Sequence, residues 1–165
     1  LPMFPDRLKN LAMLILDDAE QARLKICTAE SCTGGLLAAL LTDIPGSSAV
    51  FERGFVTYTN RAKEEMLGIA GDVIADYGAV SEPVARMMAE GALEASRANI
   101  AVAITGVAGP GGGTRMKPVG TVHIACAREN RAVVHEMLQL GEIGRSEVRM
   151  ASVETALNLI QMQIR

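Results

Sequence analysis

Two kinds of apolar pattern alternate along this 165-residue chain, and their alternation restricts the fold more than any single motif. Between Asp6 and Leu24 apolar residues recur at helical spacing, whereas Ile100–Thr105 is a nearly continuous apolar run of strand length. Helices are predicted at about 6–24, 35–43, 60–67, 81–97 and 145–164, and strands at 26–29, 50–58, 100–105, 119–127 and 132–140. Interleaved elements of this kind predict a three-layer α/β/α sandwich around a mixed, mostly parallel sheet of about five strands. We expect a single domain over residues 1–165.

Composition argues against several classes of partner. The formal net charge of −3 gives no basic surface for a nucleic acid, so any bound anion must be met by local groups. No apolar run approaches the 18 residues of a membrane span and no signal peptide is visible, so we expect a cytoplasmic protein without a membrane partner. Cys27, Cys32 and Cys126 have no metal-ligand spacing, and we expect reduced thiols, no metal and no cofactor.

The segment TAESCTGG, residues 28–35, lies at the junction of a predicted strand and a predicted helix. Such a junction presents free backbone N–H groups and the positive end of a helix dipole, and its glycines let a ligand approach the backbone. Ser31 is the candidate nucleophile. The alternative is that Ser31 and Thr33 only cap the helix that begins near Gly34.

The predicted helix 60–67, with Asn60 as its N-cap, carries two cations in its first turn. Arg61 and Lys63 oppose the helix dipole, which favours acidic residues at this end. Either an anion binds over the helix start, or Lys63 has a depressed pKa and acts as a neutral base beside a nucleophile. A third interpretation is a solvated lysine balanced by Glu64 and Glu65.

Residues 106–113 contain five glycines in eight positions directly after a predicted buried strand. A strand follows them, so they are no dinucleotide-binding fingerprint; they form either a backbone cradle for a ligand or a long connection. Arg145 and Arg149 lie on one face of the last helix, where they suit a phosphate or form an exposed pair. His123 is expected to be a packed residue.

Six ordered motifs together resemble a known family. They are residues 28–35 (TAESCTGG), 45–48 (PGSS), 54–60 (GFVTYTN) with Lys63, 78–83 (GAVSEP), 105–112 (TGVAGPGG) and 117–122 (KPVGTV). Over about residues 25–150 the chain resembles the C-terminal domain of the competence/damage-inducible protein CinA and its stand-alone relatives, the nicotinamide-nucleotide amidohydrolases. The resemblance implies hydrolysis of nicotinamide mononucleotide to nicotinic acid mononucleotide and ammonia, in pyridine nucleotide salvage.

The resemblance also implies roles for individual residues. Ser31 would be the nucleophile, Lys63 its activating base and Tyr58 a proton relay or oxyanion donor. Glu30 could face the pyridinium of the substrate. The remaining residues expected at the nucleotide pocket are Thr33, Gly34, Ser48, Thr105, Gly106, Gly109 and Arg145.

The chain departs from the family pattern in two places. Many relatives carry a compact Gly-Asp-Arg before the last helix, whereas Gly141–Arg145 is a longer turn with Glu142 in place of Asp. Residues 1–165 contain no counterpart of the N-terminal molybdopterin-binding-like domain of full CinA proteins, and we expect the stand-alone form. The competing hypothesis is a non-catalytic nucleotide-binding or regulatory domain linked to competence or the DNA damage response. We expect a small-molecule nucleotide as substrate and a homo-oligomer, a dimer, as the assembly.

Overall fold

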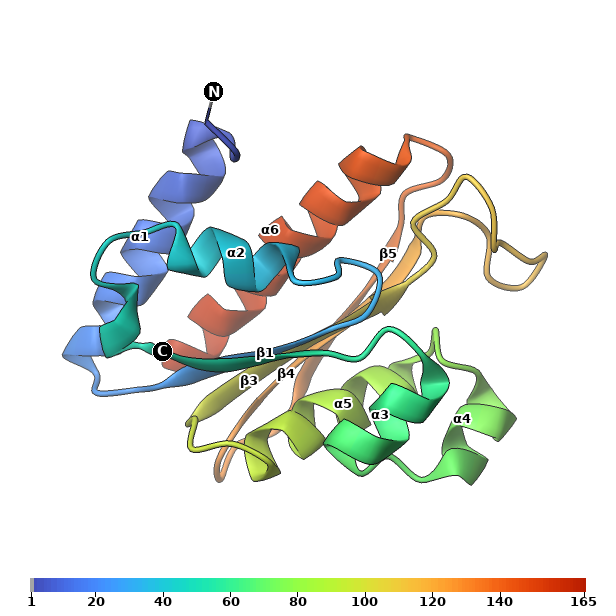
Figure 1. Cartoon of the computed structure of the whole chain (residues 1–165), viewed down its shortest axis with the longest axis horizontal. Helices are drawn as coiled ribbons and strands as arrows, with labels where there is room; N and C mark the ends of the chain where they lie inside the picture. The colour runs from blue at the N-terminus through green and yellow to red at the C-terminus, as the bar shows by residue number, and fades with distance from the viewer. Residues whose placement is uncertain (1) are drawn as a thin grey trace.

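A central sheet lies between two layers of helices in the computed structural model, which describes residues 2–165 (Figure 1). The helices are α1 (Asp6–Gln21), α2 (Leu36–Thr42), α3 (Asn60–Leu67), α4 (Gly71–Tyr77), α5 (Glu82–Glu94) and α6 (Arg145–Ile164), with a short 3₁₀ turn at Ser47–Ala49. The strands are β1 (Ile26–Glu30), β2 (Phe51–Val56), β3 (Ile100–Gly106), β4 (Thr121–Arg128) and β5 (Val134–Gln139). The three-layer α/β/α architecture predicted from the alternating pattern is confirmed.

The sheet has the strand order β2-β1-β3-β4-β5. β1 pairs in parallel with both β2 and β3, whereas the β3–β4 and β4–β5 pairs are antiparallel. The sheet is therefore mixed, as predicted, with four of its five strands running in one direction. The glycine-rich segment connects β3 to β4, and a hairpin turn connects β4 to β5 (Figure 1).

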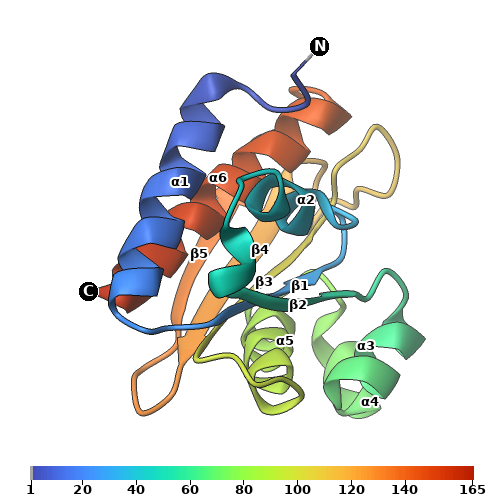
Figure 2. The ribbon, with the colours of Figure 1, turned by 60° about the vertical axis from the view of Figure 1, so that its left-hand side comes forward.

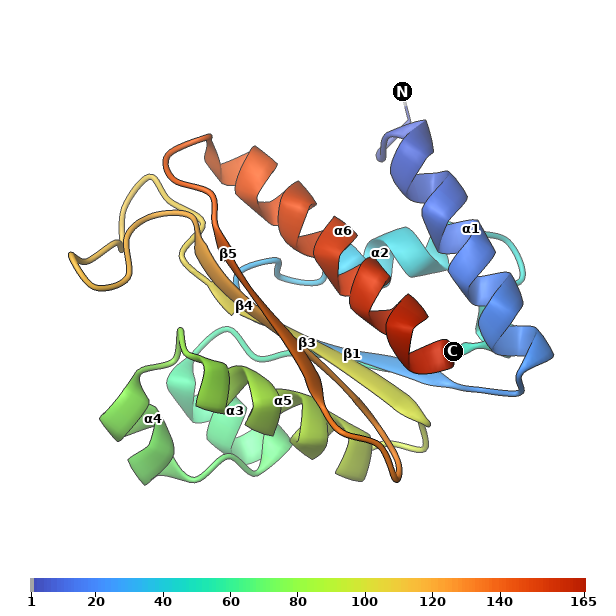
Figure 3. The same ribbon diagram turned by 180° about the vertical axis from the view of Figure 1, so that it is seen from behind.

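The two faces of the sheet carry side chains of different size. Large residues such as Ile100 and Ile124 pack against α1, α2 and α6, which lie together on one side of the sheet (Figures 2 and 3). The other face carries small residues, among them Ala101, Ala103 and Ala125, beneath α5. Because small side chains let a helix approach closely, alanines of α5 pack directly on this face.

The predicted helices and strands all form, with bounds within three residues of those observed, and two local features differ from the prediction. Ser81, the first residue of the predicted helix 81–97, caps α5 by accepting a hydrogen bond from the backbone N–H of Val84. α4 is absent from the predicted helices; only Ile74 of this seven-residue helix is buried, so the apolar period that marks a helix is missing. The N-cap of α3 is Thr59, not Asn60, because the Thr59 hydroxyl accepts from the N–H of Ala62 at 3.0 Å.

The topology brings three loops to one end of the sheet. The connection from β1 to β2 passes through α2 on one face, whereas the connection from β2 to β3 passes through α3, α4 and α5 on the other (Figure 1). Chain leaving β1 and chain leaving β2 therefore diverge to opposite sides. In open α/β sheets ligands bind at the carboxyl ends of strands where the connections diverge in this way.

In residues 2–165, no helix is both long and apolar enough to span a bilayer.

Candidate active site

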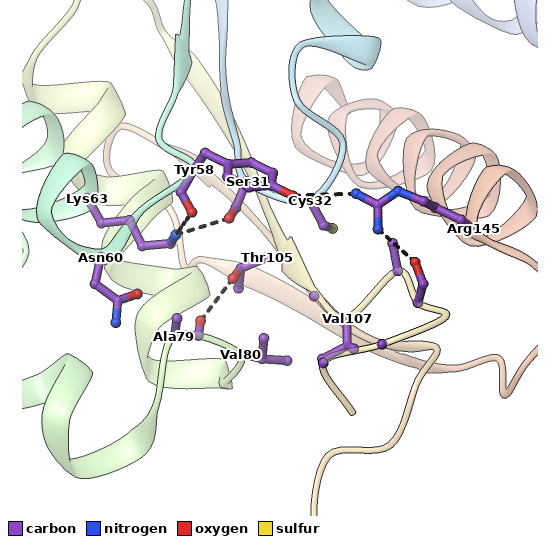
Figure 4. Close-up of a pocket in the computed structure, with 15 residues that line it drawn as sticks. Ser31, Cys32, Tyr58, Asn60, Lys63, Ala79, Val80, Thr105, Val107 and Arg145 are labelled. Carbon is purple, nitrogen blue, oxygen red and sulfur yellow. Dashed lines mark hydrogen bonds between the residues drawn. The ribbon is translucent and has the colours of Figure 1, made fainter. Parts of the chain in front are cut away.

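Ser31 and Lys63 meet at the carboxyl end of β1. Ser31 directly follows β1, and its backbone N–H still donates to the carbonyl of Ile104 on β3. Lys63, in the first turn of α3, extends toward it, and its Nζ lies 3.0 Å from Ser31 Oγ (Figure 4). The capping alternative for Ser31 and Thr33 is wrong, because the N-cap of α2 is Gly35 without a side-chain cap and the Thr33 hydroxyl has no hydrogen-bond partner. A hydroxyl and an amine 32 positions apart in sequence thus form one hydrogen-bonded pair.

Lys63 is buried without a carboxylate partner. Its side chain is 1% exposed, and Nζ donates to the carbonyl oxygens of Thr57 at 2.9 Å and Tyr58 at 3.5 Å. Desolvation by burial lowers the pKa of Lys63, because taking the amine out of water disfavours its charged form. Of the three interpretations of this lysine, burial excludes the solvated one, and the geometry is that of an amine of depressed pKa beside a hydroxyl. Arg61, the other cation, lies in solvent and pairs with Glu65 at 3.7 Å.

Glu30 turns away from Ser31 because successive residues of a strand point to opposite faces. Its carboxylate is 1% exposed and accepts hydrogen bonds from the backbone N–H groups of Leu37 at 2.8 Å and Ala38 at 3.1 Å. These groups belong to the first turn of α2, so the carboxylate occupies the positive end of that helix. The backbone N–H groups at the start of α2, which the sequence analysis considered for ligand binding, therefore bind the Glu30 carboxylate instead.

A cavity of about 300 Å³ lies in front of the Ser31–Lys63 pair, at the loops that follow β1, β2 and β3 (Figure 4). Seven of the residues predicted at the site line it: Ser31, Tyr58, Lys63, Thr105, Gly106, Gly109 and Arg145. Thr105 is fixed by its hydroxyl, which donates to the carbonyl of Ala79 at 2.9 Å. The cavity is therefore built from the carboxyl ends of all three parallel strands.

Arg145, at the start of α6, joins two walls of this cavity. Its Nη1 donates to the carbonyl of Gly109 at 2.7 Å, and its Nη2 lies 3.4 Å from the hydroxyl of Tyr58. Gly109 has a φ of +88°, and a Cβ there would lie 2.5 Å from Val119, so the loop needs glycine at this position. The Tyr58 hydroxyl thus faces Arg145, while the carbonyl of the same residue faces Lys63.

Four residues predicted to bind substrate do not line the cavity. Glu30 caps α2, and Thr33 is fully buried with its carbonyl accepting from Arg149 at 3.0 Å. Gly34 follows Thr33 in the same turn and lies beside the side chain of Arg149. Ser48 belongs to the turn before β2, next to Val50, whose carbonyl accepts from Ile26 N at the amino end of β1. At about 3.3 Å per residue, the length of β1 separates Ser48 from Ser31 by roughly 16 Å.

Several cavity residues escaped the sequence analysis. Asn60 was interpreted as a cap, but since Thr59 takes that role, Asn60 contributes to the cavity wall. Cys32 also lines it; burial raises the pKa of its thiol to about 11, so the thiol stays protonated at neutral pH. Ala79 and Val80 come from the turn before α5; they lie in the motif at residues 78–83, but their apolar side chains gave no reason to assign them a role.

His123 is a packed residue, as expected, and its partner is His135. Their rings are stacked, with Nδ1 and Nε2 2.9 Å apart, on the face of the sheet that α5 covers. No group of three or more His, Cys, Asp or Glu side chains within residues 2–165 is arranged to hold a metal ion.

The fold and this site define a class of protein: a three-layer α/β/α protein with a buried serine–lysine pair at the carboxyl ends of its parallel strands. The model of the CinA C-terminal domain matches residues 8–164, and the chain belongs to that family. A CinA-like protein of Akkermansia muciniphila is 60% identical over 129 residues, which are 78% of this chain and 31% of that protein. A CinA-like protein of Anaeromyxobacter sp. is 45% identical over 163 residues, 99% of this chain and 39% of that protein.

Solved structures agree with this assignment. The competence/damage inducible protein CihA of Agrobacterium tumefaciens has a TM-score of 0.98 and 51% identity, with all of both chains covered. A CinA superfamily protein of Escherichia coli has a TM-score of 0.89 and 32% identity over 98% of this chain and 94% of that one. The chain spans about a third of the length of the curated relatives named above.

Proposed function

We propose that this protein is an amidohydrolase that converts nicotinamide mononucleotide and water to nicotinic acid mononucleotide and ammonia. The observation that supports the proposal is the 3.0 Å contact between Ser31 Oγ and the buried Nζ of Lys63, at the wall of a cavity. A regulatory domain that only held a nucleotide would have no need for a desolvated amine beside a hydroxyl. The substrate is suggested by the family resemblance of the motifs that line the cavity.

The hydrogen bonds around Lys63 suit a general base. A neutral amine has two N–H donors and one lone pair, and the carbonyls of Thr57 and Tyr58 accept the two donors. The lone pair is then left for the hydroxyl of Ser31. When Ser31 attacks the carboxamide carbon, Lys63 takes its proton, and the two carbonyl dipoles stabilise the new ammonium.

In the proposed reaction the attack forms a tetrahedral oxyanion, to which the backbone N–H of Cys32 is the adjacent donor. Collapse breaks the carbon–nitrogen bond, and the Lys63 ammonium returns its proton to the leaving ammonia. The resulting ester between Ser31 and the nicotinoyl group is cleaved by water, which Lys63 deprotonates in turn. Both half-reactions need the same pair of residues and the same oxyanion donor.

Arg145 is the cation that the proposal assigns to the phosphate. It stands on the cavity wall with its guanidinium held by Gly109 and Tyr58, and it starts α6, where the helix dipole also favours an anion. Tyr58 contributes its carbonyl to Lys63 and its hydroxyl to this wall. Glycines 109, 111 and 112 line the same cavity and leave its backbone open to a ligand.

Ammonia release from nicotinamide mononucleotide tests the proposal, with free nicotinamide as the control substrate. We expect turnover by the wild type and none by Ser31→Ala, which should keep its fold because only one hydroxyl is removed. Incubation with the substrate should also let a nicotinoyl ester on Ser31 be trapped and detected by mass spectrometry. Equal ammonia release by wild type and Ser31→Ala would refute the serine mechanism.

A further inference from the structure

Arg149 is a half-buried arginine on α6, one turn after Arg145, and it does not line the cavity. Its Nη2 donates to the carbonyl of Thr33 at 3.0 Å. Within residues 2–165 it makes no other hydrogen bond and has no carboxylate within ion-pair distance. Because no carboxylate neutralises this guanidinium, its charge polarises the one peptide group to which it donates a hydrogen bond.

The peptide group it contacts is the first of two in a hydrogen-bonded series. The Thr33 carbonyl shares its peptide unit with the N–H of Gly34, and this N–H donates to the carbonyl of Ser31 at 3.0 Å. The Ser31 carbonyl shares its own peptide unit with the N–H of Cys32. Arg149 is thus connected to the Cys32 N–H through two peptide units and one hydrogen bond between them.

The Cys32 N–H is the end of this series. No backbone or side-chain acceptor of another residue receives it within the described chain, and Cys32 lines the cavity. It directly follows the proposed nucleophile, the position whose N–H stabilises the oxyanion in enzymes with a serine on a strand-to-helix turn. Hydrogen bonds in series polarise one another, so a cation at one end strengthens the donor at the other.

We propose that Arg149 is a positioning residue that orients and polarises the Cys32 N–H toward the oxyanion formed at Ser31, an inference that rests on the proposed hydrolase function. The two arginines of α6 then have separate tasks. Arg145 faces the ligand, whereas Arg149 acts from behind the loop and touches no reacting atom. The inference predicts an effect on the transition state without an effect on substrate binding.

A substrate-free measurement tests the connection itself. Selective ¹⁵N-cysteine labelling gives three backbone amide signals, from Cys27, Cys32 and Cys126, and Cys32→Ser assigns the middle one by removing it. We expect Arg149→Met to move the Cys32 proton signal upfield while Cys27 in β1 stays in place. The matched control is Arg128→Met, which removes an arginine–carbonyl contact (2.7 Å to Gln163) and should disturb the neighbouring Cys126 only.

Kinetics test the consequence. Removal of a whole oxyanion donor costs about 10²–10³ in kcat, so a weakened donor should cost about tenfold in Arg149→Met with KM within about twofold. The thioamide analogue of the substrate develops charge on sulfur, a poorer hydrogen-bond acceptor, so the ratio of amide to thioamide kcat/KM should fall in this variant. Arg149→Lys, which keeps the cation, should recover part of both losses. Arg128→Met should leave the ratio at its wild-type value.

Two results would overturn the inference: an unmoved Cys32 signal in folded Arg149→Met protein, or an equal loss for amide and thioamide in that variant. A wild type that hydrolyses neither substrate would instead refute the proposed function, and the Cys32 signal would still decide whether Arg149 acts on that N–H.

Discussion

Glu30 offers the sharpest separation between a structural and a ligand-binding role. Its carboxylate accepts two backbone N–H groups of α2, and Leu37, which supplies one of them, is fully buried. Glu30→Ala removes both charge-assisted bonds and leaves a buried donor without an acceptor. We expect a loss of about 3 kcal/mol in the free energy of unfolding, from about 2 for the charged bonds and ~1 for the unpaired donor.

Urea unfolding at fixed pH measures this loss, and the midpoint should fall while the m-value stays constant. For a chain of this size about 2–4 °C of Tm corresponds to each kcal/mol, so thermal unfolding should shift down by about 6–12 °C. Glu30→Gln keeps one acceptor and should lose about half as much, and Glu129→Gln, an exposed position in the β4–β5 hairpin, serves as the control. An unchanged midpoint in Glu30→Ala, together with a raised KM, would refute the capping role and restore the contact with the pyridinium.

Three further predictions concern the buried amine, the phosphate and the thiols. Burial lowers the pKa of Lys63 from its ordinary value of 10.5. Between the folded and the unfolded pKa the unfolded chain binds more protons, so the free energy of unfolding rises with pH across that window. Lys63→Met should flatten this rise, measured by unfolding at several pH values, and should abolish turnover. If Arg145 meets the phosphate, nicotinamide mononucleotide should exceed its riboside in kcat/KM by about 10- to 150-fold, from a contact of about 1.5–3 kcal/mol, and Arg145→Ala should remove most of the preference; equal values in the wild type would contradict the assignment. Burial raises the pKa of Cys27 and of Cys32 to about 11 and raises that of Cys126 as well. A disulfide-exchange reagent at pH 7 should therefore label no thiol of the native protein quickly and all three after denaturation. Rapid labelling of Cys32 in the native protein would contradict this and show an ionised thiol beside Ser31.

The sequence determined which local elements form and which residues are chemically out of place. Apolar period and strand-length runs depend only on near neighbours, which is why α3 and α6 were predicted with the bounds the structure has. Lys63 stood out for the same local reason, since a cation in the first turn of a helix needs an explanation. Even the separation of Glu30 from Ser31 onto opposite faces is implied by the two-residue period of a strand.

Only the tertiary structure decided which partner each of these residues meets. Nothing local to Ser31 shows that Lys63, rather than Arg145 or Arg149, reaches it; this follows from α3 and α6 lying on opposite faces of the sheet. Ser48 has a motif as regular as the others, yet the crossover through α2 returns the chain to the amino end of the sheet before β2 begins. The pKa of Lys63 likewise depends on burial by segments distant in sequence, because desolvation is set by the surroundings of the amine and not by its neighbours in the chain.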